Sequence, residues 1–428
     1  MIRCSRLVSA AAAAALVLAM VATIAGCGHA AVRSGVAPGA GSTGNRQTAA
    51  ATSGRTPASG ATKKTPVWLD DVQMVSAKLG WALLWTSSPD VPAGAPLEVG
   101  RTTDGGRIWT VVTPPAAVSA LANGDALLRA VSSRRAWLAV APYSGRLSRY
   151  TLIFGTGTGG ASWQVSARVR GSQPVAIDFV GTMRGWLLES LGAAMAQNPV
   201  RLYRSSDAGV RWSLIARSAT SAADPPSSSG LPLYCGKVAL AFASAQTGWI
   251  TGYCNSLADA VLESVNGGKN WTSPSLPLPV GLCQLAGCEV PAPQFAGTST
   301  FLEICVYPSA AYLLVSANNG ATWQTERLPA GAGPYPRLQF FSATRAIAVS
   351  AGSQGAIGRD FYLTTNGGQS WTAVRQSRRF GSGGASYDFV SQSTGFAWND
   401  GIEGPVQPRL FLTTNSGRSW RTITPVLS

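Results

Sequence analysis

The sequence has almost no histidine and few charged residues. Its single histidine is His29, and charged residues make up only 12% of the chain. The part of the chain after His29 therefore excludes a Ser-His-Asp triad, a Cys-His pair and a His-ligated metal. No Walker motif is present, and no G-x-G-x-x-G pattern occurs in a βαβ setting; Gly155, Gly157 and Gly160 fit the pattern but belong to a turn motif. We expect no cofactor, no metal and no nucleic-acid partner.

Long apolar runs are also scarce, because only Leu7–Ile24 is long enough to resemble a membrane-crossing segment. Arg3 and Arg6 precede this run, and small residues lead from it to Cys27, as in a secretory signal. Small residues directly before a cysteine resemble the lipobox of bacterial lipoproteins, which implies lipidation of Cys27. The alternative is an ordinary signal with an incidental cysteine. We expect residues 1–27 to be a lipoprotein signal peptide, with the mature protein lipid-anchored at the outer face of the cell membrane or in the envelope.

The next segment, residues 28–66, lacks aromatic and acidic residues and is rich in Gly, Ala, Ser and Thr. Such a composition cannot bury enough apolar surface to fold, so we expect a disordered tether about 30–40 Å long on average. Beyond it the chain holds 27 basic and 19 acidic residues. That mild excess fits a surface that contacts anionic polymers, anionic lipid or an acidic protein. The alternative is a compositional preference for Arg with no specific partner.

One motif, Ser/Thr-x-Asp/Asn-x-Gly-x-x-Trp, recurs through residues 67–428. Its Trp residues are 54, 49, 59, 52, 48 and 49 positions apart. The acidic position is held in turn by Asp104, Thr158, Asp207, Asn266, Asn318, Asn366 and Asn415, and the Trp position by Trp109, Trp163, Trp212, Trp271, Trp323, Trp371 and Trp420. The copy with Thr158 is a decayed one.

A second pattern precedes each motif, in the same phase. An apolar residue is followed, usually seven positions later, by an aromatic or aliphatic one: Met74/Trp81, Ala130/Trp137, Phe179/Trp186, Phe242/Trp249, Phe295/Phe301, Phe340/Ile347 and Phe389/Phe396. Short β-rich runs separate these points, for example 237–242, 248–253, 260–264 and 271–273. Four short strands in about 50 residues form one propeller blade. We therefore predict an all-β fold, a seven-bladed β-propeller of four-stranded antiparallel blades over residues 67–428.

These motifs resemble the Asp-box, or BNR-repeat, propellers. That family includes sialidases, sortilin-type receptors and the photosystem II assembly/stability factor-like lipoproteins. Thr364–Trp371, together with the hairpin pattern before each box, is most similar to the last group. The resemblance implies a protein-binding assembly factor, although it transfers no particular partner.

The box residues themselves are interpreted as turn-forming. Asp, Asn and Thr all occupy the acidic position, whereas a general acid or a metal ligand would need a carboxylate in each case. The sialidase arginine motif before the first box is absent, because that region reads Trp68-Leu69-Asp70-Asp71-Val72. Sialidase propellers also have six blades. We therefore expect a non-enzymatic monomer, with an envelope glycan-binding or sialidase-like hydrolase as the alternative.

Five cysteines follow Cys27. Their spacing relative to the hairpins of the fourth and fifth repeats predicts the bridges Cys235–Cys254 and Cys288–Cys305, which leaves Cys283 over. The rival assignment joins Cys283 to Cys288 and leaves Cys305 as a buried thiol.

Function is expected on the face that carries the long connections, because loops on a rigid scaffold are where binding residues gather. The chief insertions are 217–236 and 273–293, on either side of the fourth repeat. Candidate contacts for a protein or an envelope glycan are Arg201, Arg359, Asp360, Arg409, Tyr143, Tyr253 and Glu403. The competing interpretation is that these are ordinary solvated groups.

Overall fold

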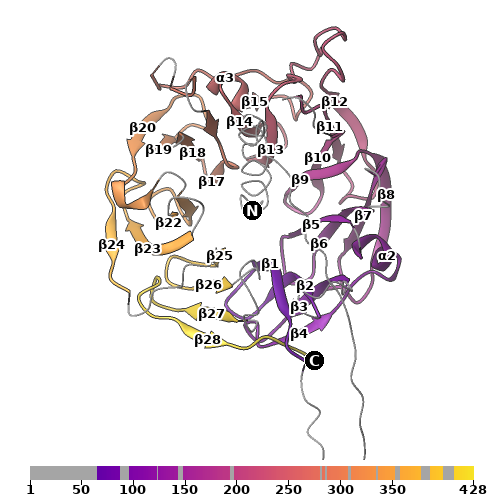
Figure 1. Cartoon of the computed structure of the whole chain (residues 1–428), viewed down its shortest axis with the longest axis vertical. Coiled ribbons are helices and arrows are strands. Elements are labelled where there is room, and N and C mark those ends of the chain that lie inside the picture. The colour runs from indigo at the N-terminus through magenta and orange to yellow at the C-terminus, as the bar shows by residue number, and fades with distance from the viewer. Residues whose placement is uncertain are drawn as a thin grey trace, which may run out of the picture. The chain divides into compact units, whose positions relative to one another are not determined.

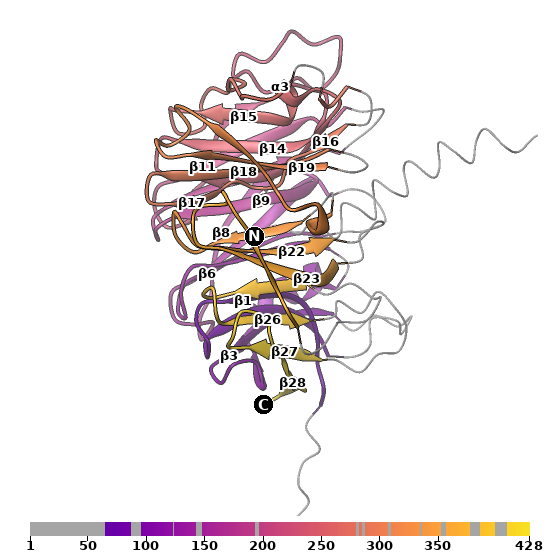
Figure 2. The ribbon, with the colours of Figure 1, turned by 90° about the vertical axis from the view of Figure 1, so that its left-hand side faces the viewer.

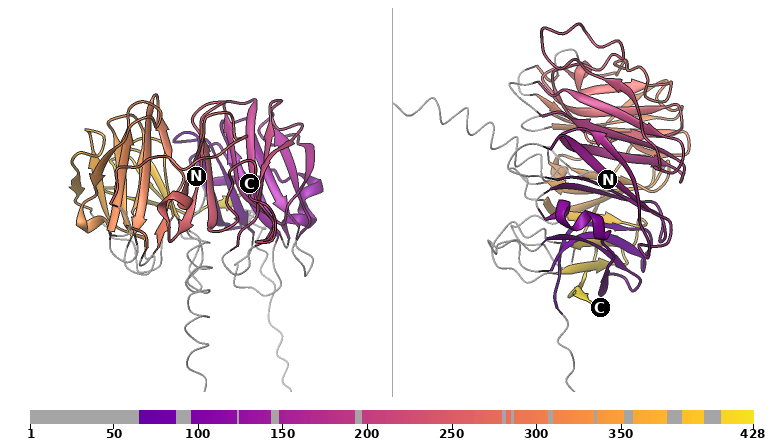
Figure 3. Two further views of the ribbon diagram at one scale, coloured as in Figure 1. Left: turned by 90° about the horizontal axis from the view of Figure 1, so that it is seen from above. Right: turned by 90° about the vertical axis from the view of Figure 1, so that its right-hand side faces the viewer.

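The strands from Thr65 onward stand as sheets around a common centre, and the first strand of each repeat lies nearest that centre (Figure 1). The computed structural model describes residues 65–86, 96–122, 124–142, 148–192, 197–279, 282–284, 287–306, 310–333, 336–351, 357–376, 386–398 and 409–428. In these ranges the strands form six sheets that are antiparallel apart from one added strand. The expected leader, Cys27 and tether lie outside the described residues. Seen from the side, the strands cross the thickness of the ring (Figures 2 and 3).

Repeats are numbered here by their box Trp residues, from Trp109 to Trp420. Repeat 1 forms a sheet of β1 (Trp68–Met74), β2 (Gly80–Trp85), β3 (Leu97–Thr102), β4 (Ile108–Val111) and, at its edge, β29 (Val426–Leu427). Repeat 2 forms β5 (Asp125–Ala130), β6 (Ala136–Ala141), β7 (Tyr150–Thr156) and β8 (Gln164–Arg170). Repeat 3 forms β9 (Gln173–Val180), β10 (Arg184–Ser190), β11 (Val200–Ser205) and β12 (Ser213–Arg217).

Repeats 4 and 5 share one eight-stranded sheet. Its strands are β13 (Gly236–Phe242), β14 (Gly248–Cys254), β15 (Val261–Ser264), β16 (Cys288–Glu289), β17 (Gln294–Ala296), β18 (Ser299–Val306), β19 (Ala310–Ser316) and β20 (Gln324–Arg327). The short β16 pairs with both β14 and β18 and so joins the two repeats. The strand expected at 271–273 is reduced to an isolated bridge between Thr272 and Glu263.

The last two repeats form regular four-stranded sheets. Repeat 6 comprises β21 (Arg337–Phe340), β22 (Ala346–Ala351), β23 (Ile357–Thr364) and β24 (Thr372–Val374), and repeat 7 comprises β25 (Ser386–Phe389), β26 (Gly395–Trp398), β27 (Leu410–Thr413) and β28 (Arg421–Ile423). The described helices are single turns, η1 (Pro115–Ala117), α2 (Val118–Leu121), α3 (Leu257–Ala260) and η2 (Ala330–Ala332). In the described ranges, no helix is both long enough and apolar enough to cross a membrane.

Each box forms the turn that follows the third strand of its repeat and leads to the place of the fourth strand. In repeat 1 the Thr102 hydroxyl accepts the Gly106 N–H at 3.0 Å, and Asp104 Oδ1 accepts the N–H groups of Arg107 and Ile108, each at 3.0 Å. The decayed box keeps the second of these two bonds with a hydroxyl, because Thr158 Oγ1 accepts the Ser162 N–H at 2.9 Å. A local acceptor is therefore enough for the turn, which explains why Asp, Asn and Thr interchange there.

The box is tied to the first hairpin turn of the same repeat. A box N–H donates to a carbonyl of that turn in each of the seven repeats: Gly105 to Lys78, Gly159 to Arg134, Ala208 to Met183, Gly267 to Gln246, Asn319 to Thr298, Gly367 to Thr344 and Ser416 to Ser393. Both kinds of turn therefore lie at one end of the sheets. We call this end the turn face, and the opposite end, with the long connections, the loop face.

The core lies between neighbouring sheets. Seven clusters of buried apolar residues can be distinguished in the described structure, and each joins two consecutive repeats. One cluster joins repeat 7 to repeat 1 through Phe396 and Trp109, both 0% exposed. Stacked rings reinforce the packing: the ring centroids of Trp137 and Phe179 are 3.4 Å apart. Burying such rings supplies most of the stabilisation of this kind of core.

Polar side chains also link the inner strands from one repeat to the next. In five places the side-chain oxygen of a Gln or Asp near the end of one repeat's first strand accepts a backbone N–H from the first strand of the next repeat. The acceptor and donor residues are Gln73 and Ala130, Asp178 and Phe242, Gln294 and Phe340, Gln339 and Phe389, and Asp388 and Met74. Arg129 instead forms a 2.8 Å ion pair with Asp178. Repeat 4 has Ala241 at the corresponding place, and there β16 joins the neighbouring sheets instead.

The C-terminal strand closes the ring on repeat 1. Strand β29 runs parallel to β4, with Val426 opposite Ile108. Val426 also forms a bridge with Pro66, and Val67 donates its N–H to the Pro425 carbonyl at 3.1 Å. This closing strand has no clear signal in the sequence, because only two of its residues pair.

The bridge Cys235–Cys254 is confirmed, but the prediction of Cys288–Cys305 is wrong. Cys288 pairs with Cys283, as in the rival assignment, and Cys305 remains a buried thiol. In the β16–β18 pair, Cys288 lies opposite Val306 while Cys305 lies opposite Glu289. Successive residues point to opposite sides of a sheet, so these two side chains point away from each other.

Candidate functional site

The predicted contact residues lie on several separate sheets. Arg201 is half-buried near the start of β11, Tyr253 is exposed near the end of β14, Asp360 is half-buried in β23, and Arg409 is exposed just before β27. No hydrogen bond or ion pair joins any two of these four. Only the backbone of Arg359 is described, in β23, and Tyr143 and Glu403 lie outside the described residues.

Arg201 stands beside a buried carboxyl group that the sequence analysis did not single out. Glu189 is its partner across β10 and β11 and is 0% exposed. Thr151 donates to Glu189 Oε2 at 2.8 Å, while Oε1 has no partner in the described structure. Burial raises the pKa of Glu189 to about 8, so the group is neutral near pH 7.

The backbone closes over this carboxyl group. A Cβ atom at Gly171 would lie 2.0 Å from Glu189 Oε2, so only glycine fits above it. The Tyr203 hydroxyl donates to the Arg170 carbonyl at 2.8 Å, and burial raises its pKa although Arg201 opposes the shift. Glu189 is therefore enclosed by its neighbours and is not exposed at the surface. We interpret it as a packing group beneath the loop face.

A second feature is the insertion between β12 and β13, residues 218–235. At its tip Asp224 accepts the N–H groups of Thr220 and Ser221, at 2.8 and 3.0 Å. The Thr220 hydroxyl also donates to Asp224. This hydrogen bond has the largest effect, and together with the two N–H bonds it lowers the pKa of Asp224 to about 2. At its base, the Ser229 hydroxyl donates to the Arg217 carbonyl at 3.0 Å. The insertion is therefore held in one conformation by its own side chains.

Lys237 fixes the end of the insertion to the sheet. Its ammonium group is buried and donates to the carbonyl oxygens of Asn198, Pro232 and Tyr234, at 3.2, 2.5 and 2.7 Å. Burial lowers its pKa to about 7, against the opposing charge of Asp259. Directly after Tyr234, the disulfide from Cys235 ties the same segment to β14.

Two exposed tyrosines adjoin the two cysteines of that disulfide. Tyr234 is 49% exposed and Tyr253 is 46% exposed. A Cβ at Gly236 would lie 2.0 Å from the Tyr253 ring, so the ring packs closely against the backbone of Gly236. Exposed aromatic rings on a rigid support provide large contact areas at a low cost in conformational entropy, which suits protein recognition.

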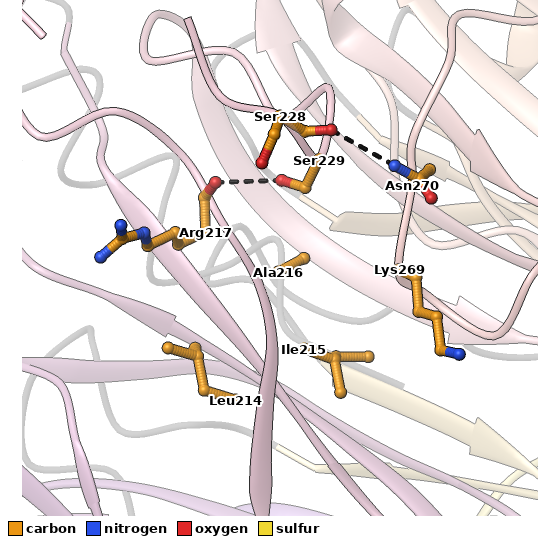
Figure 4. A pocket seen from close by; sticks show the side chains of 8 residues that line it. All are labelled: Leu214, Ile215, Ala216, Arg217, Ser228, Ser229, Lys269 and Asn270. Carbon is orange, nitrogen blue, oxygen red and sulfur yellow. Dashed lines mark hydrogen bonds between the residues drawn. The ribbon is translucent and has the colours of Figure 1, made fainter. Parts of the chain in front are cut away.

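A shallow hollow of about 260 Å³ lies at the foot of the insertion, beside β12 (Figure 4). The cations Arg217 and Lys269 line it without a carboxylate, and Asn270 Nδ2 donates to the Ser228 carbonyl at 3.3 Å on its rim. The hollow is smaller than a typical pocket for a small-molecule ligand. Its size and charge suit an acidic side chain of a larger partner.

The sequence did carry a signal for the buried acids. Glu189 and Glu303 each interrupt an apolar second strand, in Trp186–Ser190 and Thr300–Val306. Burial raises the pKa of Glu303 to about 8, and the Cys305 thiol lies 3.4 Å from its Oε1. The role of Lys237 had no comparable signal, because two of its acceptors lie in the insertion and the third, Asn198, lies just before β11.

Comparisons with known proteins identify a fold and no family. No protein-family model matches the chain, and no curated protein matches it. A GH74 enzyme from Niastella koreensis is similar in structure, with a TM-score of 0.54 and 15% identity over 85% of this chain and 55% of that one. A GH74 xyloglucanase from Xanthomonas campestris has a TM-score of 0.50 and 12% identity, with 83% and 54% covered.

YCF48 bound to D1 peptide also matches, with a TM-score of 0.44 and 12% identity over 71% of this chain and 83% of that one. The chain spans about half the length of the two GH74 chains. At these identities the likeness concerns the fold alone. Together with the sheets arranged around one centre, the likeness to the two GH74 structures supports a β-propeller.

Proposed function

We propose that this protein is an exported, membrane-anchored lipoprotein whose β-propeller binds a protein partner through its loop face and assists the assembly of an envelope or membrane complex. The observation that carries the proposal is the pair Tyr234 and Tyr253, both exposed and both adjoining the disulfide that fixes the insertion. The two disulfides in the propeller agree with an oxidising, exported location. Lipidation at Cys27 and the tether over 28–66 are part of this proposal.

We further infer seven blades of the Asp-box type. Seven boxes each bond to their own hairpin turn, and seven apolar clusters each join consecutive repeats, including repeat 7 to repeat 1. In this assignment repeats 4 and 5 are two blades that β16 joins into one sheet, and β29 closes the ring on blade 1.

The absence of catalysis is also a proposal. The buried carboxyls Glu189 and Glu303 have the raised pKa of a general acid, but Gly171 closes over the first and Glu303 is only 7% exposed. An acid that no substrate can reach cannot protonate a leaving group. The alternative, a glycan-binding or glycan-cleaving propeller, draws on the fold shared with GH74 enzymes.

Affinity capture from detergent-solubilised membranes tests the function. Full-length protein should retain one protein partner in stoichiometric amount, and the double variant Tyr234→Ser/Tyr253→Ser should lose it while the melting temperature is unchanged. The matched control is Val111→Ser, which removes an exposed apolar side chain (39%) from β4, away from the insertion. Turnover of an envelope glycan that a single carboxylate substitution abolishes would contradict the proposal.

A further inference from the structure

The turn face carries an unusual distribution of charge. The hairpin turns and box turns that form it hold eight exposed cations in six of the seven repeats: Lys78, Arg107, Arg134, Arg184, Arg211, Lys269, Arg345 and Arg418. In the described structure none of them forms an ion pair with a carboxylate. These cations therefore lie in every repeat except the fifth and are not confined to one patch.

Acidic groups on the same turns are few and already engaged. Only Asp104 and Asp207 occur there, and their side chains accept backbone N–H groups of their own boxes. The opposite end of the sheets mixes both signs, with exposed Asp125 and Asp259 as well as exposed Arg149 and Arg170. The propeller is thus electrically polarised, with its positive end at the turn face.

Exposed apolar side chains occur among these cations in repeats 3 and 4. Met183 is 52% exposed, Val210 is 44% exposed and Val265 is 72% exposed. Met183 and Val210 lie on turns that hydrogen-bond to each other, since Ala208 donates to the Met183 carbonyl at 2.9 Å. Each of the three lies one to four residues from a cation, namely Arg184, Arg211 or Lys269.

We infer that the turn face is a docking surface for an anionic lipid bilayer. Cations at the tips of turns around a ring match an extended anionic surface, and each contributes attraction to acidic headgroups. Apolar side chains at the same tips can enter the headgroup region, as they do in proteins that lie on membranes. An acidic protein would need a complementary shape, whereas a bilayer accommodates separate small tips.

The consequence is an orientation. With the turn face on the bilayer, the loop face with Tyr234 and Tyr253 points away from the membrane, toward other envelope components. The inference does not depend on a particular partner at the loop face or on an acyl chain at Cys27. It can therefore stand or fall separately from the proposed function.

The test measures partition of full-length protein to vesicles. All samples carry Cys27→Ala, so that no acyl chain contributes, and the quantity is the ratio of binding to phosphatidylcholine vesicles with and without phosphatidylglycerol. Residues 1–66, with their apolar leader and basic side chains, are the same in every sample, so a difference in this ratio between variants reports the propeller alone. Reversing Arg134, Arg184 and Arg211 to Glu should lower the ratio by about tenfold or more, and high salt should remove the preference for anionic vesicles.

The matched control reverses three exposed cations outside the turn face, Arg149, Arg170 and Arg375, and changes the net charge equally. This control variant should have a ratio within about twofold of that of the Cys27→Ala protein without charge reversals. A further variant, Val265→Asn, keeps the charge and should weaken binding to the anionic vesicles. The inference is overturned by an unchanged ratio in the turn-face variant, by an equal fall in the control, or by no preference for anionic vesicles. Capture of an acidic protein through Arg211 without vesicle binding would also overturn it.

Discussion

At the scale of single residues, the buried acids set how the propeller responds to pH. Glu189 and Glu303 have pKa values raised by burial to about 8, far above their usual range. Between the unfolded pKa near 4.5 and the folded value, the native state keeps a proton that the unfolded chain has lost. Their stabilising contribution is therefore complete below the lower value and is lost as the pH rises to about 8.

We expect the free energy of unfolding to fall between pH 5 and 8, by up to about 1.4 kcal/mol per pH unit for each group. Glu189→Gln and Glu303→Gln should flatten this fall, because an amide keeps the neutral form at every pH. Urea unfolding across that pH range measures the effect. Asp125→Asn, at an exposed position, is the control. A slope that is the same in the wild type and in both Gln variants would contradict the assignment.

The box residues follow a different rule, because their acceptors matter and their charge does not. Asn366 Oδ1 accepts the Ser370 N–H at 3.0 Å, and Asn366 Nδ2 donates to the Ser370 hydroxyl at 2.8 Å. Asn366→Ala should destabilise the propeller by about 1 kcal/mol, since a turn donor loses its acceptor. Asn366→Asp should remain close to the wild type, as Asp occurs in this position elsewhere in the chain. Thermal unfolding of the two variants decides, and equal losses would show that the acceptor is not what matters.

At the scale of elements, the insertion 218–235 is the segment on which the binding proposal depends. Lys237→Met keeps much of the buried volume but removes the three hydrogen bonds to Asn198, Pro232 and Tyr234. We expect faster amide hydrogen exchange in residues 218–235 and weaker partner binding, with little change elsewhere. Lys78→Met, at an exposed turn position, is the control. Unchanged exchange in the insertion would show that the disulfide alone holds it.

The sequence was informative about elements wherever the determinants are local. The boxes and hairpin patterns predicted turns and strands because each relies on residues a few positions apart. Strand β16 was missed because its two residues pair with β14 and β18, and this also explains the wrong partner for Cys288. The buried Glu189 beside Arg201 could not be foreseen either. Thr151 and Gly171 come close to Glu189 only because repeats 2 and 3 pack against each other.

At the scale of the whole molecule, the propeller is held together by contacts that pass from repeat to repeat. Asp388 completes the circuit, because its Oδ2 accepts the Met74 N–H at 2.6 Å between repeat 7 and repeat 1. Strand β29 reinforces the same junction from the outer edge. The junction therefore depends on residues at the two ends of the described chain.

Removing this link should destabilise the ring. Asp388→Ala leaves the Met74 N–H without its acceptor, and we expect a loss of about 1–3 kcal/mol in the free energy of unfolding. Asp388→Asn keeps an oxygen acceptor and should lose less. Chemical denaturation of both variants checks this, and equal losses would mean that the acidic proton, and not the acceptor, stabilises the junction.

The two faces of the propeller are assigned different tasks, binding of a protein at the loop face and contact with lipid at the turn face. Site-specific photocrosslinking in intact cells tests both at once, with a photoreactive side chain in place of Tyr234 or of Arg211. The account predicts that position 234 crosslinks to a protein and position 211 to lipid. Lipid adducts at position 234 together with protein adducts at position 211 would contradict it.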